Sequence, residues 1–169
     1  PGTPAFAEVL QAQALLDWTR GRTNRAESRY REALVIHETD PAGAPKVGEL
    51  HNELAALMND LGRYDAAIPH ARAAVASARE LRLPPAALGP RLENLGSALQ
   101  GAGHLEESDR TYGEAIRTLE QALPERTVAL AVALNNHALV YRDLGRPKDA
   151  LARFERAIEQ ARRAQQRCI

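Results

Sequence analysis

The chain has 169 residues, of which 44% are hydrophobic, and it carries 22 basic and 22 acidic side chains. This length fits one compact domain or a short repeat array, and the apolar fraction excludes a disordered chain. The zero net charge excludes a strong basic field, so we expect no nucleic-acid partner for the chain by itself. No apolar run approaches the length of a membrane span, and we expect a cytoplasmic protein with no membrane partner.

Alanine is abundant, with 32 residues, whereas aromatic residues make up only 4% of the chain. This composition favours helices packed closely along a line over one large hydrophobic centre. Cys168 is the only cysteine, which excludes an internal disulfide framework, and we interpret it as a free thiol near the end of the chain. Because the sequence starts at Pro1 and not at Met, we interpret it as a piece of a longer protein.

Four glycines, which we call the turn glycines, mark an internal repeat: Gly21, Gly62, Gly103 and Gly145, spaced by 41, 41 and 42 residues. Small residues recur seven residues before, five after and twelve after each of them. These twelve residues are Ala14, Ala55, Gly96, Ala138, Ala26, Ala67, Ser108, Ala150, Ala33, Ala74, Ala115 and Ala157. The pattern predicts pairs of helices that cross closely at small side chains and are joined by a tight turn at the glycine.

The repeat predicts eight antiparallel helices, at about 4–20, 24–40, 46–61, 64–82, 88–102, 105–122, 125–144 and 147–166. Asn24 and Glu27 have the spacing of a capping box that would open the second helix. Pro69 lies inside the fourth helix, where it removes one backbone hydrogen bond. Six other prolines are expected between helix pairs: Pro41, Pro45, Pro84, Pro85, Pro90 and Pro124.

Residues 134–162 read LNNHALVYRDLGRPKDALARFERAIEQAR and resemble a tetratricopeptide repeat, as do residues 92–120, LENLGSALQGAGHLEESDRTYGEAIRTLE. The period resembles the long variety found in kinesin light chains and in bacterial signalling and regulatory proteins. The resemblance implies an all-α fold, a right-handed superhelix (solenoid) of four helix-turn-helix repeats. These repeats would span about 4–40, 46–82, 88–122 and 125–166, in a single array over 1–169.

The resemblance also implies that the first helix of each pair lines a concave groove that binds a partner. The candidate partner-binding residues are Gln11, Leu15, Trp18, Asn52, Asn59, Glu93, Asn94, Gln100, Asn135, Asn136 and Arg142. Amide side chains both donate and accept hydrogen bonds, which suits an extended peptide backbone, and Asn94 and Asn136 match the long-period relatives best. The alternative is that these amides only bond to neighbouring helices or to water.

Acidic residues dominate the expected groove, where only Arg142 opposes Glu8, Glu49, Asp60, Glu93 and Asp143. This bias predicts a neutral or basic protein or peptide segment as the partner, unless the acids are simply a solvated face. Trp18, the only tryptophan, could anchor a ligand, but we favour packing against its own terminal repeat.

The last predicted helix has an apolar face formed by Leu151, Phe154, Ala157 and Ile158. Such a face in a solenoid is normally covered by the next repeat or by a capping helix. It could instead mediate self-association or contact a neighbouring domain. We favour its continuation into further repeats.

No motif of an enzyme or of a metal site is present. The five histidines lack HExxH spacing, and no phosphate-binding loop or nucleophile elbow occurs. His51 and His137 fall in the stripe that packs between helices, so we expect hydrogen-bonded core or boundary side chains. We therefore predict no catalysis, no cofactor and no metal.

The predicted function is a protein- or peptide-binding scaffold or sensor module within a larger signalling or regulatory protein. The alternative is a structural module that associates with itself or docks a neighbouring domain. A rarer alternative is a sensor of a small molecule or a peptide signal.

Overall fold

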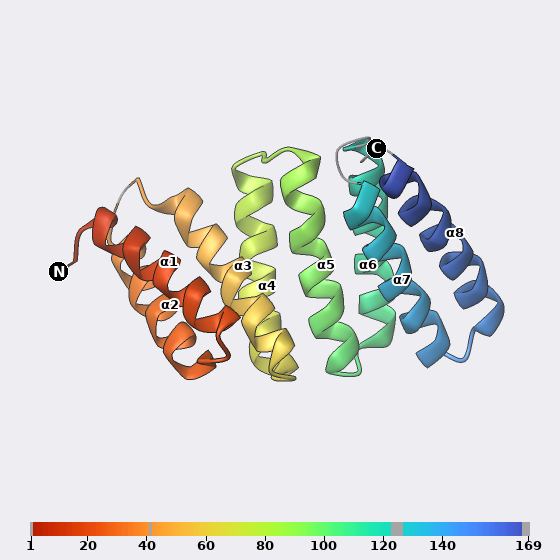
Figure 1. Ribbon diagram of the computed structural model, residues 1–169, viewed down its shortest axis with the longest axis horizontal. Helices are drawn as coiled ribbons and strands as arrows, with labels where there is room; N and C mark the ends of the chain where they lie inside the picture. Colours follow the sequence, from red (N-terminus) through yellow and green to blue (C-terminus); the bar gives the residue numbers. More distant parts are fainter. Residues whose placement is uncertain (1, 41, 123–126, 167–169) are drawn as a thin grey trace. The chain divides into compact units, whose positions relative to one another are not determined.

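The computed structural model describes residues 2–40, 42–122 and 127–166, and over this part of the chain it contains eight helices and no strand (Figure 1). The helices are α1 (Pro4–Thr19), α2 (Thr23–Glu38), α3 (Ala44–Asp60), α4 (Tyr64–Glu80), α5 (Pro85–Gly101), α6 (Leu105–Gln121), α7 (Thr127–Asp143) and α8 (Pro147–Gln166). The predicted all-α class is confirmed. Every predicted helix is present with bounds within three residues of those observed.

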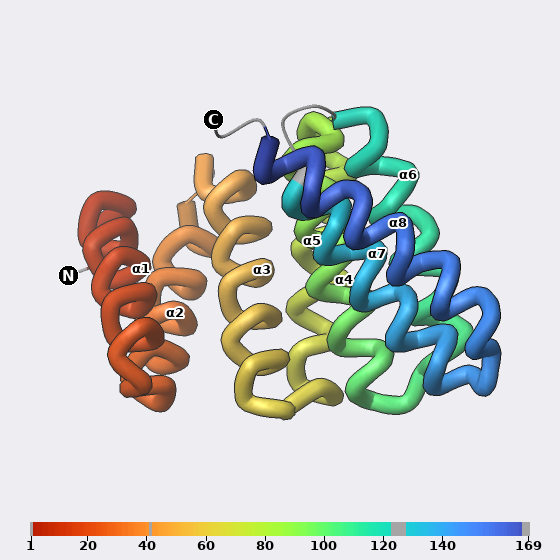
Figure 2. The backbone as a smooth tube through the Cα atoms, turned by 45° about the vertical axis from the view of Figure 1, so that its right-hand side comes forward, coloured from red at the N-terminus to blue at the C-terminus, as the bar shows by residue number. Residues whose placement is uncertain are grey.

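The chain divides into two compact units, Pro1–Arg82 and Leu83–Ile169, each with two helix pairs. In the first unit α1 packs against α2, α3 packs against α4, and α3 also packs against α2. The second unit repeats this arrangement with α5 and α6, α7 and α8, and α7 on α6; the tube in Figure 2 shows α7 and α8 side by side. Each unit is therefore built by seating the first helix of one pair on the preceding pair.

The turn glycines have the backbone conformation that the repeat predicts. Gly21, Gly62, Gly103 and Gly145 all have positive φ, between 67° and 82°. This left-handed conformation costs an L-residue with a side chain roughly 1–2 kcal/mol, whereas glycine adopts it freely. It reverses the chain direction between the two helices of each pair.

All twelve small residues of the repeat are buried, which confirms their predicted role at helix crossings. Gly96 in α5 shows how closely two paired helices approach. A Cβ atom placed there would lie 2.8–3.0 Å from ring atoms of Tyr112 in α6. The hydroxyl of Ser108 donates to the Gly96 carbonyl over 2.7 Å, so α5 and α6 are also joined by a buried hydrogen bond.

The predicted capping box is wrong. Helix α2 begins at Thr23 with Arg22 as its N-cap and without a side-chain cap bond, so Asn24 already lies inside the helix. Glu27 instead accepts bonds from Arg63, the N-cap residue of α4, with a Nη1–Oε2 distance of 2.7 Å. This bond holds the pKa of the Glu27 carboxyl below its ordinary value and links the first two repeats.

Asp17 is a buried acid at a repeat position where the other three repeats have a large apolar or aromatic residue. Its side chain is 2% exposed and pairs with Arg22 over 2.6 Å and with Arg29, both in the same helix pair. The first repeat therefore replaces a core contact between its helices with an ion pair.

Three prolines that were expected between helix pairs lie within helices. Pro45 lies in the first turn of α3, where a missing N–H is tolerated, and Pro90 lies inside α5, which begins earlier than expected at Pro85. Next to Pro90, the Arg91 guanidinium donates to the Ala87 carbonyl over 2.6 Å. Pro69 lies inside α4 as predicted, and Pro84 is the N-cap of α5. Pro41, Pro124 and Cys168 lie outside the described residues.

Replacing Gly96 with alanine tests the close approach of α5 and α6. We expect Gly96→Ala to destabilise the fold by about 1–3 kcal/mol, because the Tyr112 ring must move to admit the methyl group. Gly113→Ala in α6 is the matched control. A Cβ there meets only the Arg117 guanidinium at 3.5 Å, so the helix should gain about 0.5–1 kcal/mol.

Thermal unfolding followed by circular dichroism measures both variants. Equal midpoints for Gly96→Ala and the unaltered chain would show that the crossing tolerates a larger residue.

Candidate functional site

A polar network joins the first helices of the two pairs in the first unit. Gln11 of α1 donates from Nε2 to Glu49 over 3.1 Å and to Glu53 over 3.0 Å, and both acids belong to α3. Lys46 also pairs with Glu49, over 3.1 Å. Burial raises the pKa of the Glu53 carboxyl, while the Gln11 bond partly offsets this rise.

This network borders a hollow of about 440 Å³ between α1 and α3. Its lining residues are Glu8, Gln11, Ala12, Leu15, Lys46, Glu49 and Glu53. Three carboxylates therefore face one ammonium group. Leu15, which is 51% exposed, is the large apolar side chain in this lining and is available for contact.

Trp18 lies next to the hollow and links the two repeats of the first unit. Its indole Nε1 donates to Asp60 at the end of α3 over 3.1 Å. We expected Trp18 to pack against its own repeat, and this hydrogen bond joins it to the next repeat. The half-buried Trp18 also lines a smaller hollow of about 290 Å³ with Leu15 and Thr19. Leu15 lines both hollows.

The second unit contains the same kind of link at the same repeat positions. Gln100, like Trp18, stands three residues before its turn glycine, and its Nε2 donates to Asp143 over 2.7 Å. Asp143 and Asp60 both stand two residues before theirs. The Gln100 bond is the main cause of the lowered pKa of the Asp143 carboxyl, which also pairs with Arg142 over 2.7 Å.

Glu93 and Asn136 lie around a buried tyrosine hydroxyl in the second unit. Burial raises the pKa of Glu93 to about 7. Burial is the main cause of the raised pKa of the Tyr112 hydroxyl, the charge of Glu93 raises this pKa further, and the Asn136 side chain lowers it. Asn135 Nδ2 donates to the side-chain Oδ1 of Asn136 over 3.3 Å. Asn136 is therefore engaged in the structure as well as being a candidate binding residue.

The candidate partner-binding residues all lie on the first helices, but most are only partly accessible. Leu15, Asn135 and Arg142 are exposed. The other eight are half-buried: Gln11, Trp18, Asn52, Asn59, Glu93, Asn94, Gln100 and Asn136. Within the first unit, Gln11, Leu15 and Trp18 are brought together around the two hollows. Within the second unit, Glu93 and Asn136 are brought together near Tyr112.

Lys46 and Glu53 belong to the first-unit network but are absent from the sequence prediction. The signal for Glu53 was available, because it stands nine residues before its turn glycine, as Asn94 and Asn136 do. Nothing in the repeat pattern indicates Lys46, which stands near the start of α3 and reaches the hollow through its long side chain.

His51 and His137 pack between helices, as predicted. His137 is buried and its Nε2 lies 2.6 Å from Asp109, while the Nδ1 atoms of His51 and His70 lie 2.8 Å apart. Burial is the main cause of the lowered pKa of all three imidazoles. Among the described residues no cluster of three or more His, Cys, Asp or Glu side chains could hold a metal ion. None of the helices in the described part of the chain has the length and apolar character needed to cross a membrane.

The family model described as Tetratricopeptide repeat matches residues 87–163. The match covers 77 of the 169 residues, and this segment is similar to the tetratricopeptide repeat family. Tetratricopeptide repeats are helix-turn-helix units of the kind seen here in α5 to α8. No curated protein matches the chain.

Solved structures with the same fold cover nearly all of the chain. Aspartyl phosphate phosphatase F from Bacillus subtilis has a TM-score of 0.84 at 20% identity over 96% of this chain and 42% of its own. BtubC (BKLC) from P. vanneervenii has a TM-score of 0.84 at 21% identity over 94% of this chain and 64% of its own. A Rap protein complexed with Competence and Sporulation Factor has a TM-score of 0.76 at 16% identity over 89% and 42%.

These similarities show a helical-repeat fold of the tetratricopeptide type in both units. The chain spans less than two thirds of each of these three proteins. Folds of this type are non-catalytic scaffolds for protein interaction as a rule, although one of the three similar proteins is named a phosphatase. Because the sequence identities are only 16–21%, these structures show a shared fold and no more.

Trp18 fluorescence tests the link between the first two repeats. Asp60→Ala removes the acceptor of the indole N–H, so we expect emission to shift to longer wavelength as the ring meets more water. The loss in stability should be about 0.5–1 kcal/mol. Asp143→Ala is the matched control, because it breaks the equivalent Gln100 bond in the other unit and should leave the emission unchanged. An unshifted spectrum in Asp60→Ala would contradict the link.

The buried Glu93 carboxyl predicts a pH-dependent stability. Its pKa is raised in the folded chain to about 7, so folding takes up a proton at intermediate pH, and stability falls as the pH rises from about 4.5 to about 7. We expect Glu93→Gln to match the unaltered chain near about pH 4 and to be more stable by about 1–3 kcal/mol near about pH 8.

Urea unfolding at several pH values measures this difference. The exposed Glu155→Gln in α8 is the control. A Glu93→Gln difference that stays constant with pH would show that the carboxyl is not desolvated.

Proposed function

We propose that this chain is a protein- or peptide-binding module that takes its partner on the faces of its first helices, α1, α3, α5 and α7. One observation supports this most directly, the hollow between α1 and α3 together with the smaller hollow on α1 that shares Leu15 with it. There an exposed leucine and a half-buried tryptophan lie beside three carboxylates. Exposed apolar groups rimmed by charge are typical of interaction sites.

The hollow favours a partner of defined chemistry. Leu15 and Trp18 offer an apolar contact for one aliphatic or aromatic side chain of the partner. Glu8, Glu49 and Glu53 would pair with a basic side chain next to that anchor. The partner is therefore a neutral or basic segment with an apolar residue close to lysine or arginine.

The second unit supplies amides in place of an apolar hollow. Asn135 of α7 is exposed, and Asn94 of α5 is half-buried. Asn135 stands ten residues before its turn glycine, and Asn94 stands nine before its own. Such amides can bond to both the N–H and the C=O groups of an extended peptide backbone. We infer that this surface contributes backbone recognition and that the first unit contributes side-chain recognition.

We infer further that the module is a sensor or scaffold part of a larger cytoplasmic signalling or regulatory protein. The 41–42-residue spacing supports a single array over 1–169 of the long-period, kinesin-light-chain-like variety. The similar fold of a Rap protein solved with Competence and Sporulation Factor supports a protein or peptide partner for such arrays. We propose that this segment itself performs no catalysis.

A random peptide library displayed on phage, selected on the immobilised chain, tests the binding proposal. We expect enriched peptides to combine one apolar anchor with flanking lysine or arginine. Their synthetic versions should quench or shift Trp18 fluorescence, and their affinity should fall at high salt because the contacts are ionic. Enrichment of acidic peptides would contradict the proposed partner chemistry.

Two changes then locate the bound peptide. Leu15→Asp should weaken binding about tenfold or more, because it places a charge against the apolar anchor. The double change Asn94→Ala with Asn136→Ala tests the amides, and Val35→Asp, at a 59% exposed position on α2, is the control for surface charge. Affinity that survives both the Leu15 and the asparagine changes in a folded chain would exclude the first-helix faces.

A second candidate function is self-association or docking of a neighbouring domain through the C-terminal helix. One observation favours it. Ile158 of α8 is 52% exposed and lies in an apolar groove.

A further inference from the structure

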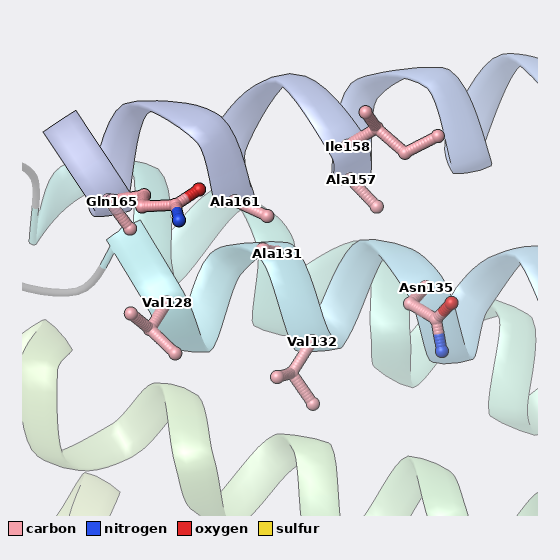
Figure 3. A pocket seen from close by; sticks show the side chains of 9 residues that line it. Val128, Ala131, Val132, Asn135, Ala157, Ile158, Ala161 and Gln165 are labelled. Atoms are coloured by element: carbon pink, nitrogen blue, oxygen red, sulfur yellow. The ribbon is translucent and has the colours of Figure 1, made fainter.

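The last helix pair carries an apolar hollow. It measures about 580 Å³ and lies between α7 and α8, where it is lined mainly by Val128, Val132, Ile158 and Ala161, with Asn135 and Gln165 also lining it (Figure 3). We call it the α8 groove. Val128, Val132 and Ile158 are all exposed large apolar side chains.

The preceding pair shows what such a groove accommodates. Ile116 in α6 stands thirteen residues after its turn glycine, as Ile158 does in α8. Ile116 is only 3% exposed, against 52% for Ile158, because it lies in a buried cluster with Leu130 and Leu134 of α7. The groove of the preceding pair is thus filled by the first helix of the next pair, and we call such a groove a seat. The α8 groove is the equivalent seat on the last pair, and no described helix fills it.

Helix α1 carries the complementary surface. Phe6, Val9, Gln13 and Leu16, which we call the α1 outer face, stand at the repeat positions of Leu130, Ala133, His137 and Val140 in α7. The four α7 residues are buried, and α7 packs on α6. The four residues of the α1 outer face are all exposed, Val9 by 51%.

The sizes of the residues at the two surfaces compensate. Leu119 of α6 and Leu130 of α7 share the buried cluster of the second unit. Ala161 takes the position of Leu119 in α8, and Phe6 takes the position of Leu130 in α1. A smaller residue in the seat therefore meets a larger residue on the helix that would enter it, which keeps the packed volume similar.

A contact near the start of α8 extends the match between the two surfaces. Leu151 stands at the repeat position of Asp109, which bonds to His137. An α1 helix in the seat would bring the side chain of Gln13 over Leu151, which is itself 59% exposed. Both large exposed apolar residues of α8, Leu151 and Ile158, would then be covered by one helix.

We propose that the α8 groove of one molecule binds the α1 outer face of a second copy, so that chains associate head to tail. The inference rests on the second candidate function above and names both contacting surfaces. The two surfaces differ, so the contact is heterologous, and each added molecule leaves one free groove and one free α1 outer face. Association therefore continues beyond a dimer unless a ring closes.

Sedimentation velocity of the full 169-residue chain over a wide concentration range tests the proposal. We expect the unaltered chain to show a mass that rises with concentration. Val9→Glu, on the α1 outer face, and Ile158→Glu, in the α8 groove, should each weaken association about a hundredfold, because each would bury an unpaired charge. Val35→Glu is the matched control and should associate as the unaltered chain does.

Mixing the two variants gives the sharpest result. The Val9→Glu chain retains an intact groove, and the Ile158→Glu chain retains an intact α1 outer face. Each should be monomeric alone, and together they should form a one-to-one dimer that grows no further. Circular dichroism of both variants confirms that these surface changes leave the helices folded.

Three outcomes would overturn the head-to-tail contact, and they point to different occupants. A monomeric unaltered chain at every concentration removes self-association altogether and leaves the groove to a helix of another protein or a further repeat. Association that is lost with Ile158→Glu but kept with Val9→Glu indicates a symmetric contact between two α8 helices. Association lost in both variants but not restored by mixing shows that the two surfaces do not meet.

Discussion

The structure depends on close crossing between paired helices at positions where no side chain is larger than alanine or serine. Two helices approach this closely only if small residues from both meet, since the interior is packed as densely as an organic crystal. Gly96 illustrates the constraint, because the Tyr112 ring occupies the space that a methyl group would need. The turn glycine between the helices is the second condition, as its left-handed backbone brings the two small faces into contact.

Polar links between consecutive repeats are a consequence of this repeated geometry. Once helices recur at a fixed offset, side chains about 42 residues apart become neighbours, as Gln11 and Glu53 or Gln100 and Asp143 do. The same residues carry the candidate binding chemistry. A partner that enters the hollow between α1 and α3 would therefore meet carboxylates already held by the fold. Such preorganised groups cost less conformational entropy on binding.

The two ends of a repeat array differ from its middle for the same physical reason. Within each unit, the first helix of the second pair buries one stripe on the preceding pair, as α3 does on α2 and α7 on α6. Among the described residues, no helix pair precedes α1 and no helix follows α8. The exposed Val9 and Ile158 are the result, although both stand at positions that are buried elsewhere in the array.

The sequence by itself determined the all-α class, the eight helices, the turn glycines and the buried small positions. These features follow from local backbone preference and from periodicity, which recur in all four repeats. It failed at Asn24 and Glu27, where a capping pattern was overridden because Glu27 pairs with Arg63, 36 residues away. It also failed at Pro90, since packing of α5 tolerates a proline inside the helix.

The candidate site shows the same division. Repeat position alone placed Gln11, Trp18, Asn94 and Asn136 on the first helices. Only the tertiary structure decided which of them are accessible and what they contact: Trp18 reaches Asp60 of the next repeat, and Lys46 and Glu53 join Gln11 around one hollow. The reason is physical. Periodicity determines which face of a helix a residue occupies, whereas accessibility and charge depend on the side chains that neighbouring helices bring to that face.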